Sequence, residues 1–346
     1  AQAKYVLEDQ NLPFVLDFLC QQNAFISHNI SGIYKFHQIF HDFLNEECQK
    51  SDIDLQRIIC RAGNWYSQHG DHAQAFKFWL MSKDYEHIFE ELEYSNISNI
   101  SSINPKLLSQ IFNYTDQTLR YKYPLSTLKY IFFYVLHVDK QMGIRLLKEA
   151  MEYFETHSLP DYSCERMLAE GYIIYTSIAF NDYNQIIKHS QKALELLNGK
   201  TSLIRTPHSV LTYGLPHFTY AYYHTPGDFW NMTRTLLDGF GAHVKATGGC
   251  GAGFEYISRA EYALETGDYE NVETNAKKAI YKADLYDQTC IIVCAQMTLG
   301  RLYLFQNRID EYQKIVSQLL LSAKTEQNTL NLNCIDNALG YLAACN

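Results

Sequence analysis

The chain has 346 residues, of which 47% are hydrophobic and 19% are charged, and this balance excludes an intrinsically disordered protein. Its formal net charge is −9, and because an acidic surface repels phosphate backbones, we expect no binding of nucleic acid by this segment. No apolar run approaches the length of a membrane span and no signal peptide opens the chain, so no membrane partner is expected.

Cysteine and histidine positions indicate a reducing, cytoplasmic environment and no metal site. The nine cysteines are scattered through helical stretches without a paired-loop framework. Cys290 and Cys294 are one helical turn apart, but no further ligands stand at a recognised spacing, so we interpret them as buried small apolar side chains. His37 and His41 have the same spacing but lack the carboxylate of a metalloprotease motif, which favours a structural role.

Residues 1–50 read as the C-terminal part of a winged-helix domain. The chain begins in mid-pattern with Ala1 and no methionine, so we expect a fragment of a longer protein. A helix is predicted over 12–22, a small β-hairpin over 23–36, and a second helix over 37–48. Helix, hairpin and helix in this order are typical of the end of a winged-helix unit.

Residues 51–346 read as stacked helix pairs, most clearly over 254–283. Gly267 and Asp268 divide that stretch into two apolar stripes at helical spacing, and Ala260, Ala276 and Ala279 let two helix backbones approach closely. Neither helix could bury its stripe alone, so the pair needs neighbours. The other helices or pairs are predicted over 54–82, 84–95, 106–113, 126–137, 142–156, 163–180, 183–197, 209–224, 229–245, 289–305, 310–324 and 329–344.

Helix breaks near five polar residues recur at a spacing of roughly 40 residues, the period of two-helix repeats; they are Asp139, Asp182, Asp228, Asp268 and Asn307. The predicted fold class is therefore all-α: a tetratricopeptide-like helical-repeat superhelix over 51–346, preceded by a partial winged-helix unit with a small β-hairpin.

An aromatic stretch offers a candidate ligand site. Tyr213, His217, Tyr220 and His224 recur at spacings of 4, 3 and 4, so they would line one helical stripe, and Trp230 follows shortly after. Rings with polar tips can line a pocket for an uncharged or aromatic ligand, and they can equally pack between helical layers. Gly214 and Pro216 weaken an interior helix and favour the pocket.

The glycine-rich run 248–253 has three interpretations. As a nucleotide-binding loop it lacks the following Lys-Ser/Thr and a preceding strand. As a tight connection it would supply positive φ angles before a helix. As a ligand site, its amides at a helix start would hold a carboxylate or polar group, which makes Gly251, Gly253 and Glu255 candidate contacts.

Nothing in the sequence argues for an enzyme. No phosphate-binding loop of the Gly-rich Lys-Ser/Thr type is present, and no serine or cysteine lies in a recognised nucleophile motif. We expect no catalytic residues and no cofactor in this segment.

The sequence resembles a known family at several places. The run from Tyr34 to Leu44 resembles the motif that ends the winged-helix domain in large ATP-dependent LuxR-type transcriptional regulators, the group that includes the maltose regulon activator. Trp65 to Trp79 looks like the first helix pair after that motif. The runs 213–217 and 249–256 look like the clostridial-type branch of these bacterial proteins.

This resemblance implies a role in signal sensing. Full-length members carry an ATP-binding signal-transduction module, a winged helix, a helical-repeat sensor and a promoter-binding helix-turn-helix, and an inducer together with ATP drives their self-association. This chain would be the sensor with part of the winged helix, so ATP is expected only in the absent N-terminal module. The expected partner is a small-molecule inducer, with His217 varying with the ligand; the alternative is an interaction scaffold for a peptide or a repressor protein.

Overall fold

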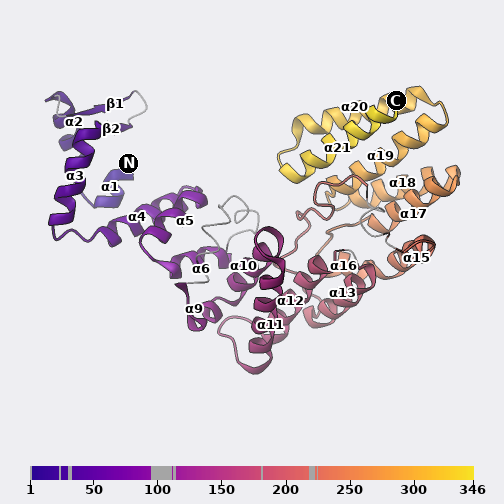
Figure 1. Ribbon diagram of the computed structural model, residues 1–346, viewed down its shortest axis with the longest axis horizontal. Coiled ribbons are helices and arrows are strands. Elements are labelled where there is room, and N and C mark those ends of the chain that lie inside the picture. Colours follow the sequence, from indigo (N-terminus) through magenta and orange to yellow (C-terminus); the bar gives the residue numbers. More distant parts are fainter. Residues whose placement is uncertain are drawn as a thin grey trace. The chain divides into compact units, whose positions relative to one another are not determined.

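The computed structural model describes residues 2–22, 25–29, 33–94, 111, 114–180, 182–217, 223 and 225–346. The chain forms two compact units, Ala1–Val138 and Asp139–Asn346, whose elements are labelled in Figure 1. Each unit is described by itself below. None of the described helices combines the length and the apolar character that crossing a membrane requires.

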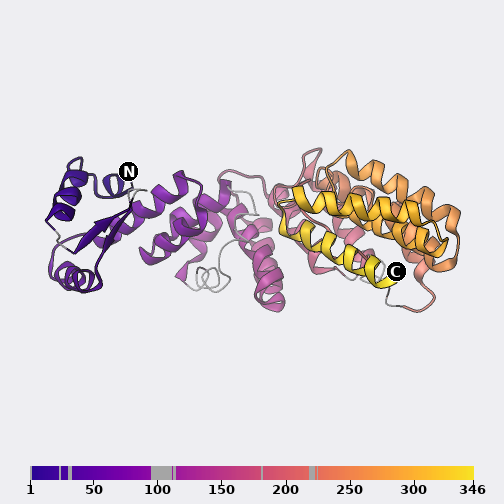
Figure 2. The same cartoon turned by 90° about the horizontal axis from the view of Figure 1, so that it is seen from above.

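The first unit opens with a helix, a hairpin and a helix, as the sequence predicts. Its elements are α1 (Gln2–Leu7), α2 (Leu12–Gln21), β1 (Ile26–His28), β2 (Tyr34–Phe36) and α3 (Gln38–Lys50). The two strands pair antiparallel with Ser27 opposite Lys35, and Figure 2 shows them side by side. His37 caps the N-terminus of α3, since its Nδ1 accepts from the amide of Ile39 at 3.4 Å, which gives this histidine the structural role expected of it.

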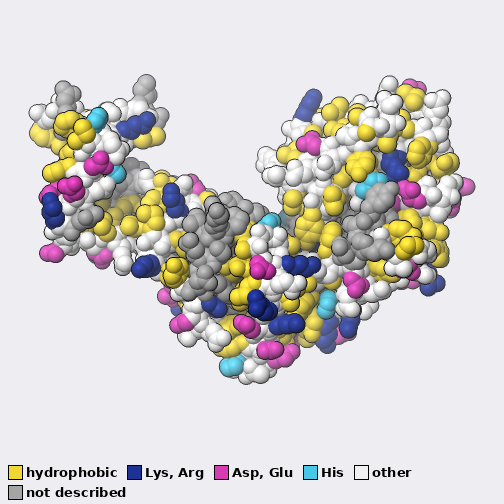
Figure 3. Space-filling model, viewed as in Figure 1, with side chains coloured by type: hydrophobic (Ala, Val, Ile, Leu, Met, Phe, Trp, Pro, Cys, Tyr) yellow, Lys and Arg dark blue, Asp and Glu magenta, His cyan; other side chains and the backbone are white. Residues whose placement is uncertain are grey.

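Apolar side chains remain exposed on this helix–hairpin–helix segment. Phe14 and Phe18 of α2 and Ile39 and Phe43 of α3 are all exposed. Figure 3 shows hydrophobic side chains gathered over this end of the first unit.

Paired helices complete the first unit; they are α4 (Leu55–Gln68), α5 (His72–Met81), α6 (Tyr85–Tyr94), α9 (Gln117–Lys122) and α10 (Pro124–His137). α4 packs on α5, α5 on α6 and α6 on α10, while α1 packs on α4. The predicted domain boundary after residue 50 therefore lies inside a compact unit, and the assignment of 1–50 to a winged-helix domain stays a prediction. Apart from the buried Ile111, the helix predicted over 106–113 lies outside the described residues.

The second unit is a stack of helix pairs; its helices are α11 (Lys140–Thr156), α12 (Cys164–Ile178), α13 (Tyr183–Leu197), α15 (Phe229–Gly239), α16 (Gly241–Ala246), α17 (Phe254–Thr266), α18 (Tyr269–Asp284), α19 (Thr289–Phe305), α20 (Ile309–Thr325) and α21 (Thr329–Cys345). Consecutive helices pack against each other from α11 to α13 and from α17 to α21, and Figures 1 and 2 show α20 and α21 side by side. The predicted all-α, helical-repeat fold class with one small hairpin is confirmed.

Small residues and aspartate caps explain why the pairs form. Ala260, Ala276 and Ala279 are completely buried between α17 and α18, as their spacing predicts. Asp268 follows the left-handed Gly267 that ends α17, and its carboxylate accepts from the amide of Asn271 in the first turn of α18. Asp139 and Asp182 cap α11 and α13 in the same way, so the recurring aspartates mark helix starts.

Of two further helix predictions, one is wrong over its described residues and the other holds with one interruption. Residues 209–217, predicted as the start of a helix over 209–224, follow an irregular path of turns. Tyr213 and Gly214 both have left-handed backbone angles, with φ of 51° and 84°, and Pro216 has no amide proton for a helical hydrogen bond. The helix predicted over 229–245 is divided at Phe240 into α15 and α16, where Gly239 and Gly241 flank the break.

Candidate functional site

The irregular segment 198–217 includes the start of the helix predicted over 209–224, and a buried carboxylate anchors its first residues. Glu170 of α12 is completely buried and accepts from Ser202 Oγ at 2.5 Å, the amide of Leu203 at 2.8 Å and the amide of Ile204 at 3.3 Å. Arg166 lies 3.2 Å from Oε1 of Glu170, the oxygen that also accepts from the amide of Leu203. Burial raises the pKa of Glu170, while these donors and Arg166 act in the opposite direction.

Tyr213 lies in the middle of this segment and is held by an arginine. Arg205 is buried and donates to the hydroxyl of Tyr213 and to Ser177 Oγ, the latter at 3.2 Å. Its guanidinium lies 5.5 Å from the centre of the Tyr213 ring, and the ring of Phe180 meets that ring edge-on at 5.4 Å. These contacts give Tyr213 a packing role within the second unit.

The end of the segment lies against the C-terminal helices. Asn337 of α21 donates to the carbonyl of Gly214 at 2.9 Å, and the thiol of Cys294 of α19 points at the carbonyl of Leu215 at 3.6 Å. Cys290 and Cys294 are buried, as the sequence predicts, and burial raises the pKa of Cys290 to about 12. Both thiols are therefore neutral packing groups.

His217 joins a buried polar cluster built from three helices. Its Nε2 lies 2.9 Å from the guanidinium of Arg301 on α19, and its Nδ1 lies 3.8 Å from the carboxylate of Glu261 on α17. Arg301 also pairs with Glu265 at 3.0 Å, and the ring of Tyr341 on α21 meets the imidazole edge-on. The predicted helical stripe is absent over 209–217, so His217 reaches this cluster from irregular backbone and not from a helix.

The remaining aromatic candidates divide into one described residue and two that are not. Trp230 of α15 is 44% exposed, and its ring lies 5.2 Å from that of Tyr262 on α17. Tyr220 and His224 lie outside the described residues. Because the helical stripe is absent over 209–217, the preference for an uncharged ligand that it suggested loses its structural basis.

The glycine-rich run 248–253 is a tight connection, and its backbone bonds to and packs against other parts of the same chain. The amide of Gly251 donates to Gln288 Oε1 at 2.7 Å. The side chain of Gln288 therefore accepts from the amide that the sequence analysis assigns to a ligand. Gly253 precedes α17 with a φ of 93°, and a Cβ there would lie 2.6 Å from the carbonyl oxygen of Ala279. The connection with positive φ angles is confirmed, and it brings α17 close to α18.

Glu255 is the predicted site residue that lies beside a pocket. Its side chain is buried, one carboxylate oxygen pairs with Lys282 of α18, and the other, Oε2, has no hydrogen-bond partner among the described residues. The ammonium of Lys282 lies 5.9 Å from the centre of the Tyr256 ring. Lys282, the partner of Glu255, also lines a hollow between α17 and α18.

That hollow has a volume of about 470 Å³ and is lined by Tyr256, Lys277, Lys278, Tyr281 and Lys282. Lys277 pairs with Glu273 at 2.8 Å, whereas Lys278 makes no hydrogen bond or ion pair with any described residue. Three ammonium groups and two phenol rings at one place are suited to an anionic ligand with a flat or apolar body. The sequence signal was the lysine-rich run of α18, which we interpreted only as a helix.

The six predicted residues that the structure describes have different contact partners. Tyr213 bonds to Arg205 and His217 to Arg301, whereas Gly251 bonds to Gln288 and Glu255 pairs with Lys282 of α18. Glu255 is next to Tyr256 in the sequence and pairs with Lys282, and both of these residues line the hollow between α17 and α18.

Comparisons with known proteins give one similar structure. No protein-family model matches the chain, and no match is found among curated proteins. Among solved structures, the chain is similar to a Signal Transduction ATPase with Numerous Domains (STAND) protein with a tetratricopeptide repeat sensor from Pyrococcus horikoshii, with a TM-score of 0.44 and 15% sequence identity. The match covers 99% of this chain and 59% of that one, so this chain spans less than two thirds of that protein's length.

Proposed function

We propose that this chain is the signal-sensing region of a bacterial LuxR-type ATP-dependent transcriptional regulator, and that its helical repeats bind a small-molecule inducer. The observation that carries the proposal is the pocket between α17 and α18, where Lys282, the ion-pair partner of the buried Glu255, lines a hollow together with two further lysines. In this proposal, ATP binds to a separate module of the full-length protein, and the inducer promotes self-association.

The chemistry of the pocket specifies the class of ligand. A volume of about 470 Å³ lies within the range of pockets for small molecules, roughly 300–1,000 Å³. Lys278 and Lys282 favour a carboxylate or phosphate, and Tyr256 and Tyr281 offer ring surfaces. The inducer in this proposal is thus a small anion with a flat or apolar body.

A panel of metabolites tests this function. A ligand that binds only the folded state raises the unfolding temperature by mass action, so thermal unfolding of the chain is measured with anionic and uncharged compounds. We expect anions with a flat or apolar body to raise it, and uncharged compounds to have little effect. If no compound does so and the chain instead retains a discrete protein partner, such as a repressor, the scaffold function replaces the sensor.

A further inference from the structure

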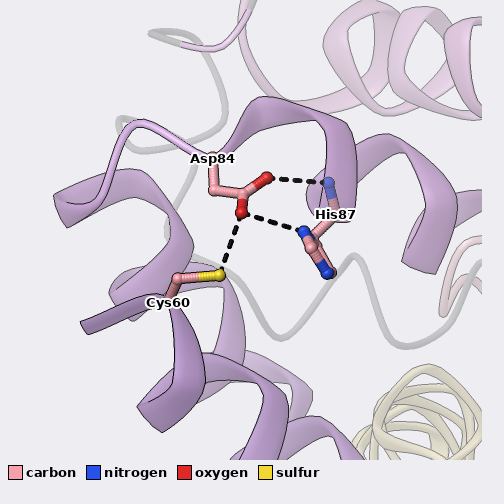
Figure 4. Close-up of side chains that lie close together, drawn as sticks. All are labelled: Cys60, Asp84 and His87. Carbon is pink, nitrogen blue, oxygen red and sulfur yellow. Dashed lines mark hydrogen bonds and ion pairs between the residues drawn. The ribbon is translucent and has the colours of Figure 1, made fainter. Parts of the chain in front are cut away.

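Three metal-ligating side chains meet in the first unit. Cys60 comes from α4, Asp84 directly precedes α6, and His87 lies in the first turn of α6. Figure 4 shows the carboxylate of Asp84 between the other two: its Oδ2 lies 2.9 Å from Cys60 Sγ and 2.9 Å from His87 Nδ1. The three ligand atoms all lie within 4.8 Å of one another.

The side chains around this cluster hold it in place. The amide of His87 donates to the other oxygen of Asp84 at 3.2 Å, which fixes the carboxylate as the cap of α6. The ring of Trp79 stacks on the imidazole at 5.7 Å. Supporting contacts of this kind orient ligands at metal sites and contribute to metal affinity.

We propose that Cys60, Asp84 and His87 bind a zinc ion that links α4 to α6. Sulfur, nitrogen and oxygen donors are the set that zinc prefers, and a thiolate with a carboxylate balances its two positive charges. The thiol proton is released to solvent on binding, and the neutral imidazole keeps its proton on Nε2 so that Nδ1 is free to coordinate.

The geometry requires a small adjustment. A tetrahedral zinc ion, with bonds of about 2.0 Å to nitrogen or oxygen and about 2.3 Å to sulfur, separates its ligand atoms by about 3.3–3.6 Å. The 2.9 Å separations around Asp84 Oδ2 must therefore widen by about half an ångström. His87 and Asp84 are partly exposed, with 41% and 24% of their side chains accessible, so rotation about their side-chain bonds provides this.

A neighbouring pocket leaves room for the fourth ligand. Cys60 and Asp84 line a hollow of about 600 Å³ together with Arg57, Arg61 and Lys83. A water molecule occupies the fourth position of a zinc ion held by three protein ligands. The surrounding cations would also admit an anion there.

Cobalt titration of the 346-residue chain tests this site. After treatment with a chelator, Co²⁺ is added to the protein and the absorption spectrum is recorded, followed by displacement with Zn²⁺. We expect saturation at one ion per chain with a thiolate-to-cobalt charge-transfer band and visible bands of tetrahedral coordination. Cys60→Ser should abolish the charge-transfer band, whereas Cys48→Ser, a half-buried thiol of α3, should leave it unchanged.

Asp84→Asn separates metal binding from folding. Asparagine caps a helix as well as aspartate does, so the fold is preserved, but the neutral amide should weaken Co²⁺ and Zn²⁺ affinity at least about tenfold. The proposal is overturned if the unsubstituted chain shows no saturable binding, or if Asp84→Asn and Cys60→Ser bind as tightly as the unsubstituted chain while circular dichroism confirms that they are folded.

Discussion

The guanidinium of Arg301 lies 2.9 Å from Nε2 of His217, and this contact connects α19 to the end of the irregular segment. Because a guanidinium can only donate, Nε2 of His217 accepts. The proton of the neutral imidazole is then on Nδ1, which faces the completely buried carboxylate of Glu261 at 3.8 Å. One arginine thereby sets the tautomer and the orientation of His217.

Removing that arginine should destabilise the second unit. We expect Arg301→Ala to lower the free energy of unfolding by about 1–3 kcal/mol, because a buried acceptor loses its donor. Arg234→Ala, which changes an exposed arginine of α15, is the control and should have little effect. Urea denaturation measures both, and a double-mutant cycle with His217→Ala should give a coupling of about 0.5–3 kcal/mol. Strict additivity would mean that the two side chains do not interact.

Glu170 should be the strongest single anchor of the irregular segment. Glu170→Ala leaves the amide of Leu203 and the hydroxyl of Ser202 without their acceptor and Arg166 without its ion-pair partner. We expect a loss of about 3–5 kcal/mol on breaking such a buried group. Glu170→Gln keeps one acceptor oxygen and should lose less. Equal stability of Glu170→Ala and the unsubstituted chain in urea denaturation would contradict this role.

Acid should weaken the fold through His243. Burial, with the charge of Arg205 nearby, lowers the pKa of this histidine from its ordinary 6.5 to about 3. Between these values the unfolded chain binds one proton more than the folded chain, so this contribution to stability is present above pH 6.5 and is lost as the pH falls. The slope is about 1.4 kcal/mol per pH unit for one such group.

Comparison with a substituted chain isolates this effect. Between pH 6.5 and pH 4.5, the free energy of unfolding should decrease less steeply in His243→Gln than in the unsubstituted chain. The difference in slope corresponds to the uptake of close to one proton on unfolding, and His137 and His189 contribute equally in both proteins. Parallel stability curves for the two chains would show that His243 is charged in the folded state.

Thiol reactivity should follow burial. The pKa of Cys290 is raised to about 12 by burial, and that of Cys294 is also raised, whereas Cys345 is exposed at the end of α21. Since only the thiolate reacts, iodoacetamide at neutral pH should label Cys345 rapidly and leave Cys290 and Cys294 unmodified in the folded chain. Peptide mass spectrometry after a short exposure measures this. Comparable labelling of Cys290 and Cys345 would mean that the core around α19 opens readily.

Local patterns predicted the helix pairs because the determinants of a helical hairpin are close in sequence. Gly267, Asp268 and the three alanines of α17 and α18 end, start and pack two neighbouring helices within one stretch of 30 residues. The apolar stripes, the helix break and the helix cap all predict the same helical hairpin there, and the structure has that hairpin.

The irregular segment escaped the same reasoning because distant groups determine its path. Tyr213 and His217 match a helical spacing, but Gly214 and Leu215 have their carbonyls bonded to Asn337 and Cys294, more than 70 residues away. Cys60 and His87 likewise meet only when α4 and α6 pack around α5. The pocket beside Glu255 depends on which faces of α17 and α18 meet the solvent, and a stripe of apolar residues does not specify this.

Ligand-dependent unfolding of a charge-reversed chain tests the sensor proposal most directly. The measurement uses a hit from the metabolite panel at about 100 times its dissociation constant, where it should stabilise the chain by about 2.7 kcal/mol. Lys278→Glu, on the exposed surface of α18, should abolish this stabilisation, whereas Lys314→Glu, on the exposed surface of α20, should retain it. Equal stabilisation of both variants would place the ligand elsewhere and contradict the pocket between α17 and α18.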